Sequence, residues 1–181
     1  MAEAFSNKIH RAAGIVTTSS SGAVGIGSTI ITGISTVGVA VSDLVDNANF
    51  IAGTKVTGYG DAASQVLVDR ASTNTAAASA QVFTFLGMTT VFTSAAATKS
   101  ILIGGTFANN TSSTVNLTVE IHDASAGIQA ALASKIPVPT GSSFVISDAG
   151  KTILEATDEV RVFCDTDNAI DVNLSILTGV S

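Results

Sequence analysis

The sequence predicts an all-β protein, and three observations predict it. Charged residues make up only 12% of the chain, against roughly 25% in ordinary soluble domains, while Val, Ile and Thr recur throughout. Such β-branched residues favour strands because their side chains pack well on a pleated surface. Apolar and polar residues alternate over residues 115–121 and 170–176. Gly, Asn and Asp, which are typical of turns, separate the short apolar runs.

We expect residues 1–22 to form an extended N-terminal arm. The arm contains the one basic cluster of the chain, between Lys8 and Arg11, and ends in a Ser- and Thr-rich connector. It is suited to lying on a neighbouring subunit, with a disordered tail as the alternative. The candidate contact residues are its apolar side chains and its arginine: Phe5, Ile9, Arg11, Ile15 and Val16.

Residues 23–86 are expected to form a small β-barrel-like module. Val37, Val39 and Val41 alternate with smaller residues, as in a strand that buries one face. Gly53 permits a tight turn before the next apolar run. The expected strands of this module lie at residues 28–32, 37–41, 54–59, 65–68 and 81–86.

The module carries a pattern of short apolar runs and a tight turn, which covers residues 37–45, 50–56, 65–68 and 72–75. In this pattern it resembles a small all-β unit of phage tail and fibre proteins and of bacterial surface proteins. In that unit a glycine-containing strand and an apolar pair precede a Gly-Thr-x-Val turn, which residues 53–56 match. A proline usually stands before the Gly-Thr pair, and this chain has an alanine there. The resemblance implies a β fold and little about function.

Residues 87–181 are expected to form an antiparallel β-sandwich or jelly roll. Apolar runs recur there at intervals of about 8–12 residues, which is the strand spacing of such folds. Pro137 and Pro139 are expected in a connection, because proline is excluded from central strands. The expected strands lie at residues 90–93, 100–109, 114–121, 129–136, 143–146, 152–154, 159–164 and 169–177.

A second pattern covers six segments of this half, which are, in order, residues 99–103, 108–112, 115–121, 136–143, 150–156 and 171–177. In these segments the half resembles the small β-sandwich domains of tailed-phage virion proteins. In that family an acidic residue with Gly-Asp often follows a Leu-Glu pair, whereas this chain has Thr157 and Asp158 there. The resemblance implies a virion component, such as a head decoration, neck or tail accessory protein, because the domain is reused at many places on phage particles.

The charge pattern narrows the choice of partners. The net charge is −6 and no run of Lys or Arg exists, whereas proteins that bind nucleic acid carry a basic stripe. The same lack disfavours anionic membranes, and the uncharged residues 12–42 are too rich in Ser, Thr and Gly for a transmembrane helix. We therefore expect neither nucleic acid nor membrane as a partner. Neutral polar surfaces are readily covered by protein, because little charge must be desolvated.

Cys164 is the only cysteine, so the chain can build neither an internal disulfide nor a thiolate metal cluster. We expect a buried structural thiol, which permits folding inside a cell. The first residues lack the charged-then-apolar pattern of a signal peptide. With the resemblance above, we expect a protein that is made in the host cytoplasm and located in the virion.

Few residues suggest chemistry. His122 beside Asp123 has the order of a base with its orienting acid, but a polar pair that faces water at a strand end is the preferred interpretation. Asp165, Asp167 and Asp171 are close in sequence, but they lack the Gly and Glu of a calcium loop. A hairpin turn at Asp167 and Asn168 is the preferred interpretation, and a weak cation site at these residues is the alternative.

Four carboxylates could supply the acid–base pair of a glycosidase: Asp148, Glu155, Asp158 and Glu159. The chain has no Trp and one Tyr, which leaves no aromatic platform for a sugar. The glycine-rich residues 22–27 are not followed by Gly-Lys-Ser/Thr, so no phosphate loop is expected. The sequence predicts no catalytic, cofactor-binding or metal-binding residue, and a chain that is not an enzyme.

We expect a structural component of a phage particle, namely a capsid decoration or cement protein that binds the virion surface as a homo-oligomer. Its expected partners are copies of itself and other virion proteins, such as the major capsid protein or neck and tail proteins. A neck, collar or tail accessory protein is the first alternative, and a host-surface binding module is the second. A stable secreted β domain with a neutral surface is a third reading of the same composition.

Overall fold

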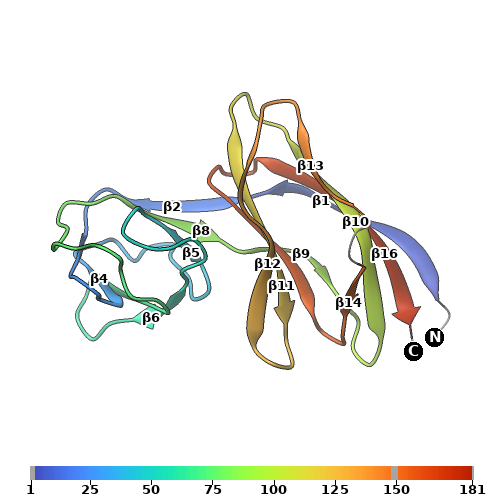
Figure 1. Cartoon of the computed structure of the whole chain (residues 1–181), viewed down its shortest axis with the longest axis horizontal. Coiled ribbons are helices and arrows are strands. Elements are labelled where there is room, and N and C mark those ends of the chain that lie inside the picture. The colour runs from blue at the N-terminus through green and yellow to red at the C-terminus, as the bar shows by residue number, and fades with distance from the viewer. Residues whose placement is uncertain (1–2, 148–150, 181) are drawn as a thin grey trace. The chain divides into compact units, whose positions relative to one another are not determined.

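The computed structural model describes residues 3–147 and 151–180, and every regular element in that part of the chain is a β-strand (Figure 1). The all-β prediction is confirmed. The chain divides into two compact units. The sandwich unit comprises Met1–Gly14 and Thr89–Ser181, and the inserted unit comprises Ile15–Met88. The inserted unit therefore interrupts the sandwich unit in sequence. It ends at Met88, two residues after the expected end of the small module at residue 86.

The sandwich unit consists of two antiparallel sheets. The first has the strand order β1-β16-β10-β13, with β14 also paired to β10, and the second has the order β12-β11-β15-β9. The strands are β1 Ala4–Ala13, β9 Thr89–Thr93, β10 Lys99–Asn109, β11 Val115–Asp123, β12 Ile128–Val138, β13 Ser143–Ile146, β14 Thr152–Leu154, β15 Glu159–Cys164 and β16 Ile170–Val180.

Side-chain alternation builds the core between these two sheets. Val115, Leu117 and Val119 of β11 are fully buried, and Leu174 and Ile176 of β16 belong to the same cluster. Burying one such aliphatic side chain contributes about 1.5–3 kcal/mol relative to leaving it in water. The two alternating strands predicted at residues 115–121 and 170–176 are confirmed, and their apolar residues form the core.

The N-terminal segment differs from the expected arm of residues 1–22. Ala4–Ala13 form β1, which pairs antiparallel with β16 along most of its length, and Ala13 is fully buried in the sandwich core. Ile15–Ser19 form β2, a strand of the inserted unit. The spacing of apolar residues in this segment does not indicate a partner strand, because that strand, β16, lies at the other end of the chain.

Pro137 also differs from the prediction, since it lies within β12 and not in a connection. Its partner across the sheet is Asn116 of β11. β12 is an edge strand, where the missing N–H of proline can face away from the ladder. Pro139 follows the end of the strand, as expected.

The inserted unit contains two small antiparallel sheets, of order β2-β8-β5 and β3-β4-β7-β6. Its core includes Phe50 and Phe83, whose ring centroids are 6.4 Å apart. A side chain at Gly22 would lie 2.9 Å from the Phe83 ring, so this glycine permits close packing. The remaining strands are β3 Ala23–Val24, β4 Ile30–Thr32, β5 Leu44–Asp46, β6 Val56–Tyr59, β7 Gln65–Val68 and β8 Phe83–Gly87.

The strand predicted at residues 37–41 is absent, and turns occupy these residues instead. Gly38 has a φ of 81°, and the Val39 N–H donates to the Thr36 carbonyl at 3.2 Å. Only Val39 is buried, while Val37 is 82% exposed. A left-handed glycine between two valines produces the same alternation as a strand, which explains the wrong prediction. The tight turn expected at Gly53 is present, with a φ of 84°.

Candidate functional site

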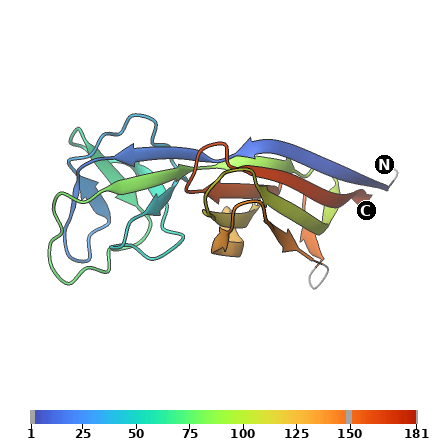
Figure 2. The same ribbon diagram turned by 90° about the horizontal axis from the view of Figure 1, so that it is seen from above.

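The first sheet of the sandwich unit has one face in the core and one outer face. Along β1 the residues with odd numbers from Phe5 to Arg11 lie on the outer face, and Phe5 is 77% exposed and Ile9 73% exposed. β1 is the end strand of its sheet (Figures 1 and 2), where it runs beside β16 and has no second partner strand among residues 3–147 and 151–180. Three of the five predicted contact residues, Phe5, Ile9 and Arg11, therefore lie together on an exposed edge strand.

An apolar row crosses this outer face from strand to strand. Phe5 lies directly opposite Leu177 of β16, Leu177 lies opposite Ile101 of β10, and Ile101 lies opposite Ile153 of β14. Phe5 and Ile153 are exposed, and the two middle residues are half-buried. Directly opposite side chains in a sheet contact each other. We call these four residues the apolar row.

A second line of residues crosses the same face nearer to the other end of β1. Ile9 lies opposite Asn173, Asn173 opposite Thr106, and Thr106 opposite the exposed Val145. A shallow open hollow of about 260 Å³ lies here, and its lining includes Ile9, Thr106, Asn173 and Asp171. The outer face thus combines apolar side chains with neutral polar ones.

Arg11 closes this face at the end of β1. Its guanidinium Nε lies 3.9 Å from Asp171 Oδ2, and the Arg11 side chain is almost fully exposed. The backbone N–H of Ala12 donates to Asp171 Oδ1 at 2.9 Å. This backbone hydrogen bond, with a smaller contribution from Arg11, holds the pKa of Asp171 below its ordinary value.

The other two predicted contact residues, Ile15 and Val16, lie on β2 of the inserted unit. β2 pairs with β8, where Ile15 is opposite Gly87 and Val16 opposite Leu86. A Cβ at Gly87 would lie 2.8 Å from the Ile15 side chain, so Ile15 covers the glycine while remaining half exposed. The structure therefore divides the five residues between two strands of two different units.

The His122 and Asp123 pair has structural partners. His122 lies opposite Glu159 across β11 and β15, with Nδ1 4.0 Å from Glu159 Oε2, and Arg161 Nε lies 2.7 Å from the same oxygen. Asp123 accepts hydrogen bonds from Ser125 Oγ at 2.8 Å and from the backbone of the turn that follows. The backbone bond is the main reason why the pKa of Asp123 is lowered.

Two of the three aspartates of the possible cation site are bound to different parts of the sandwich unit. Asp165 accepts two hydrogen bonds from Asn116, from the backbone N–H at 2.9 Å and from Nδ2 at 2.7 Å. Asp171 is bound to Ala12, as described above. Over residues 3–147 and 151–180, no three His, Cys, Asp or Glu side chains are grouped closely enough to hold a metal ion.

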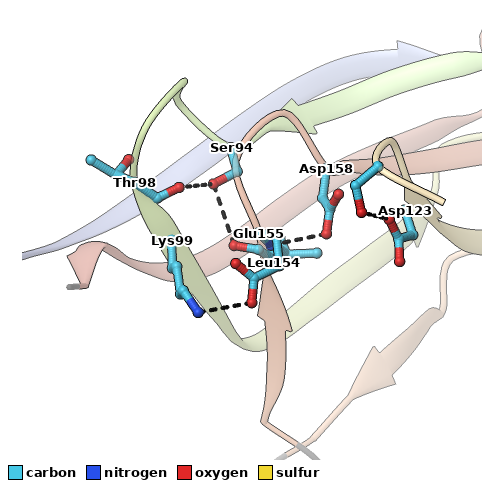
Figure 3. Close-up of polar contacts among 8 residues, drawn as sticks. Ser94, Thr98, Lys99, Asp123, Leu154, Glu155 and Asp158 are labelled. Carbon is cyan, nitrogen blue, oxygen red and sulfur yellow. Dashed lines mark hydrogen bonds and ion pairs between the residues drawn. The ribbon is translucent and has the colours of Figure 1, made fainter.

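The carboxylates considered as an acid–base pair join neighbouring loops (Figure 3). Asp158 is buried and accepts the backbone N–H groups of Ala124 at 3.0 Å and of Glu155 at 2.9 Å. Glu155 binds Lys99 at 3.0 Å at the mouth of a surface hollow of about 260 Å³. Asp148 lies outside the described residues. Each described carboxylate of this group thus stabilises a loop or a strand pair.

The sequence reasoning missed the second half of the outer face, namely Leu177, Ile101, Ile153 and Val145. Their strands were predicted, but the prediction concentrated on the side chains that alternate into the core. The signal was present in β16, where the outward positions change from Asp171 and polar residues to Leu177 at the strand end.

Comparison of the chain with models of protein families, with curated proteins and with solved structures found no match in any of the three. Within the described part of the chain, no helix is long and apolar enough to cross a membrane.

Proposed function

We propose that this chain is a structural protein of a tailed-phage particle, which attaches to the capsid as a decoration or cement protein and associates with copies of itself. The phage setting rests on the sequence resemblance, and attachment to other proteins is supported by the apolar row of Phe5, Leu177, Ile101 and Ile153 on the outer face of a sheet. A contiguous exposed apolar patch with a polar rim is typical of a surface that another protein covers.

The composition supports covering by protein. On β1 and β16 the polar residues beside the apolar row, Asn7, Asn173 and Ser175, carry no charge, whereas the Lys99–Glu155 ion pair lies at its other end. Burial of the β1 and β16 residues needs hydrogen bonds but no desolvation of ions, which lowers the free-energy cost of forming the contact there. A particle presents many identical sites, so that even a weak contact gives stable attachment when it is repeated.

The proposed neck, collar or tail accessory role uses the same surface and differs in copy number. A host-surface binding module needs free polar or aromatic loops. The loop carboxylates Asp123 and Asp165 are instead occupied by hydrogen bonds within their own turns and strands. This observation favours an assembly protein over a receptor-binding one.

The experiment that tests the proposal is the copy number per particle, measured by quantitative mass spectrometry of purified virions against the major capsid protein. Hundreds of copies support capsid decoration, and about a dozen move the chain to the neck or tail. Absence from the particle overturns the structural role. Binding of the purified Phe5→Ser and Ile153→Ser variants to particles that lack the protein then tests the apolar row, with Val37→Ser in the inserted unit as the matched exposed control.

A further inference from the structure

The outer edge of β1 offers backbone groups for pairing. β1 ends the sheet order β1-β16-β10-β13, so alternate N–H and C=O groups along it point away from β16. An edge strand of this kind is a template for another strand.

The outward side chains of this segment are self-complementary. They read Glu3, Phe5, Asn7, Ile9 and Arg11 in chain order. A second copy running antiparallel, with its Asn7 opposite the first Asn7, places Glu3 opposite Arg11 and Phe5 opposite Ile9. Each opposite-charge or apolar cross-strand pair is favourable, and the twofold axis forms each of them twice.

We propose that β1 pairs antiparallel with β1 of a second copy of this chain, centred on Asn7, so that one sheet continues across both sandwich units. The interface is isologous, since the same strand edge is used by both copies. The inference deepens the self-association within the proposed function and rests on it only for its biological setting.

Other registers fit less well. Directly opposite residues must lie on the same face of the sheet, so the register can change only in steps that keep this parity. Centring the pair on Lys8 opposes two ammonium groups, and centring it on Ile9 places Lys8 opposite His10. Centring it on Ser6 leaves Glu3 opposite Ile9. Only the register centred on Asn7 pairs Glu3 with Arg11.

Two features of β1 agree with this register. The Ser6 hydroxyl is buried and has no hydrogen-bond partner within the described part of the chain, and Lys8 of the second copy would lie directly opposite it. The pairing of β1 with β16 shifts between His10 and Ala13, where Ala12 has a φ of 59°. The regular part of the strand therefore ends near Arg11, where the proposed pairing also ends.

Disulfide trapping of the full chain tests the pairing. Asn7→Cys places two thiols opposite each other at a Cα separation of about 4.5–5.5 Å, which a disulfide can span. We expect mild oxidation to convert most of this variant into a covalent dimer at concentrations at which the wild-type chain, whose only thiol is buried, stays uncrosslinked.

Two matched variants make the test specific. Ser175 lies directly opposite Asn7 on the next strand and on the same face. Edge pairing separates its two copies by three strand spacings, about 14 Å, so Ser175→Cys should not crosslink. Lys8→Cys crosslinks only if the register is centred on Lys8. Crosslinking of Ser175→Cys in place of Asn7→Cys would indicate face-to-face packing and overturn the proposal, as would no crosslinking of either.

Charge reversal gives an independent readout in solution. Glu3→Arg places an arginine opposite Arg11 of the other copy at both ends of the pairing, so that two attractive pairs become repulsive. We expect the dimer dissociation constant of this variant, measured by sedimentation equilibrium, to rise about ten-fold. The double variant Glu3→Arg/Arg11→Glu restores opposite charges and should recover most of the affinity. An unchanged constant for Glu3→Arg contradicts the register. A crosslinked dimer that is absent from particles overturns the proposed function alone, whereas high particle occupancy without crosslinking overturns edge pairing alone.

Discussion

The Cys164 thiol at the end of β15 donates a hydrogen bond of 3.3 Å to the carbonyl oxygen of Ala13 at the end of β1. The two strands belong to different sheets of the sandwich unit. Both residues are fully buried, and burial raises the pKa of the thiol from 9.0 to about 12. This contact fixes the end of β1 inside the core.

Cys164 should therefore be unreactive in the folded chain. The thiolate is the reactive form, and a pKa of about 12 in place of 9.0 leaves about a thousand-fold less of it at pH 8. We expect a chromogenic disulfide reagent to label the native protein at least that much more slowly than the urea-unfolded protein. Similar rates in the two states would contradict the burial of this thiol. Labelling of Cys164 also reports unfolding of the sandwich unit. Tyrosine fluorescence does not, because Tyr59, the only tyrosine, lies in the inserted unit.

Asp171 should stabilise β1 in a pH-dependent manner. Its pKa is lowered below 3.8 by the hydrogen bond from Ala12, so its contribution is fully present above that value and is lost as the pH falls through the lowered pKa. Because the side chain is partly exposed, Asp171→Asn should cost only about 0.5 kcal/mol at pH 7. Urea unfolding curves of both proteins, followed by Cys164 labelling at pH 7 and by circular dichroism at low pH, measure the difference. A difference that persists below the lowered pKa would contradict the ionic origin of the effect.

Phe107 and Phe5 are on opposite faces of the same sheet and give a matched pair. Phe107 is fully buried and Phe5 is 77% exposed. Phe107→Ala should lower the free energy of unfolding by about 3–5 kcal/mol, because it leaves a cavity in the sandwich core. Phe5→Ala should change it by less than about 0.5 kcal/mol, since surface substitutions rarely change stability by more. Equal effects, measured by urea denaturation, would show that the assignment of inner and outer faces is wrong.

The N-terminal segment shows what the sequence could not provide. The alternating strands β11 and β16 were predictable because each carries its own two-faced pattern. In β1 only Ala13 is fully buried, and its identity as a strand depends on β16, which is distant in the chain. Local patterning does not encode such a pairing. Deleting residues 1–16, which a free arm would tolerate, removes a strand and a core residue of the sandwich unit.

Gly14 should tolerate no side chain. Its φ is 128°, and an added Cβ would overlap the Thr166 carbonyl and lie 2.6 Å from Cys164 Sγ. Gly14→Ala should therefore cost about 3 kcal/mol or more, from strain and overpacking together. Gly127 has a φ of 67° with open space around it, so Gly127→Ala should cost only about 1–2 kcal/mol. Cys164 labelling in urea compares the two variants, and a smaller loss at Gly14 than at Gly127 would contradict the packing described here.

The candidate site was predictable in part. Phe5, Ile9 and Arg11 are predicted as contact residues because they are apolar side chains and the arginine of a segment that holds the one basic cluster, and the structure places them on one exposed strand. Ile15 and Val16 were assigned to the same surface because a continuous arm was expected. Gly14, which lies between the two groups, marks the passage to another unit. Leu177 and Ile153 are not among the predicted contact residues, because a sheet face is assembled from strands that are remote in sequence.

The passage at Gly14 has its counterpart at Thr89, and the Gly14 N–H donates to Thr89 Oγ1 at 3.4 Å. The chain thus leaves the sandwich unit and returns to it at touching points, and each unit has its own core. A domain whose two ends lie close together can therefore be inserted between Gly14 and Thr89 at a small cost in loop-closure entropy. Evolution or protein engineering can exchange the inserted unit while the sandwich unit keeps its own core.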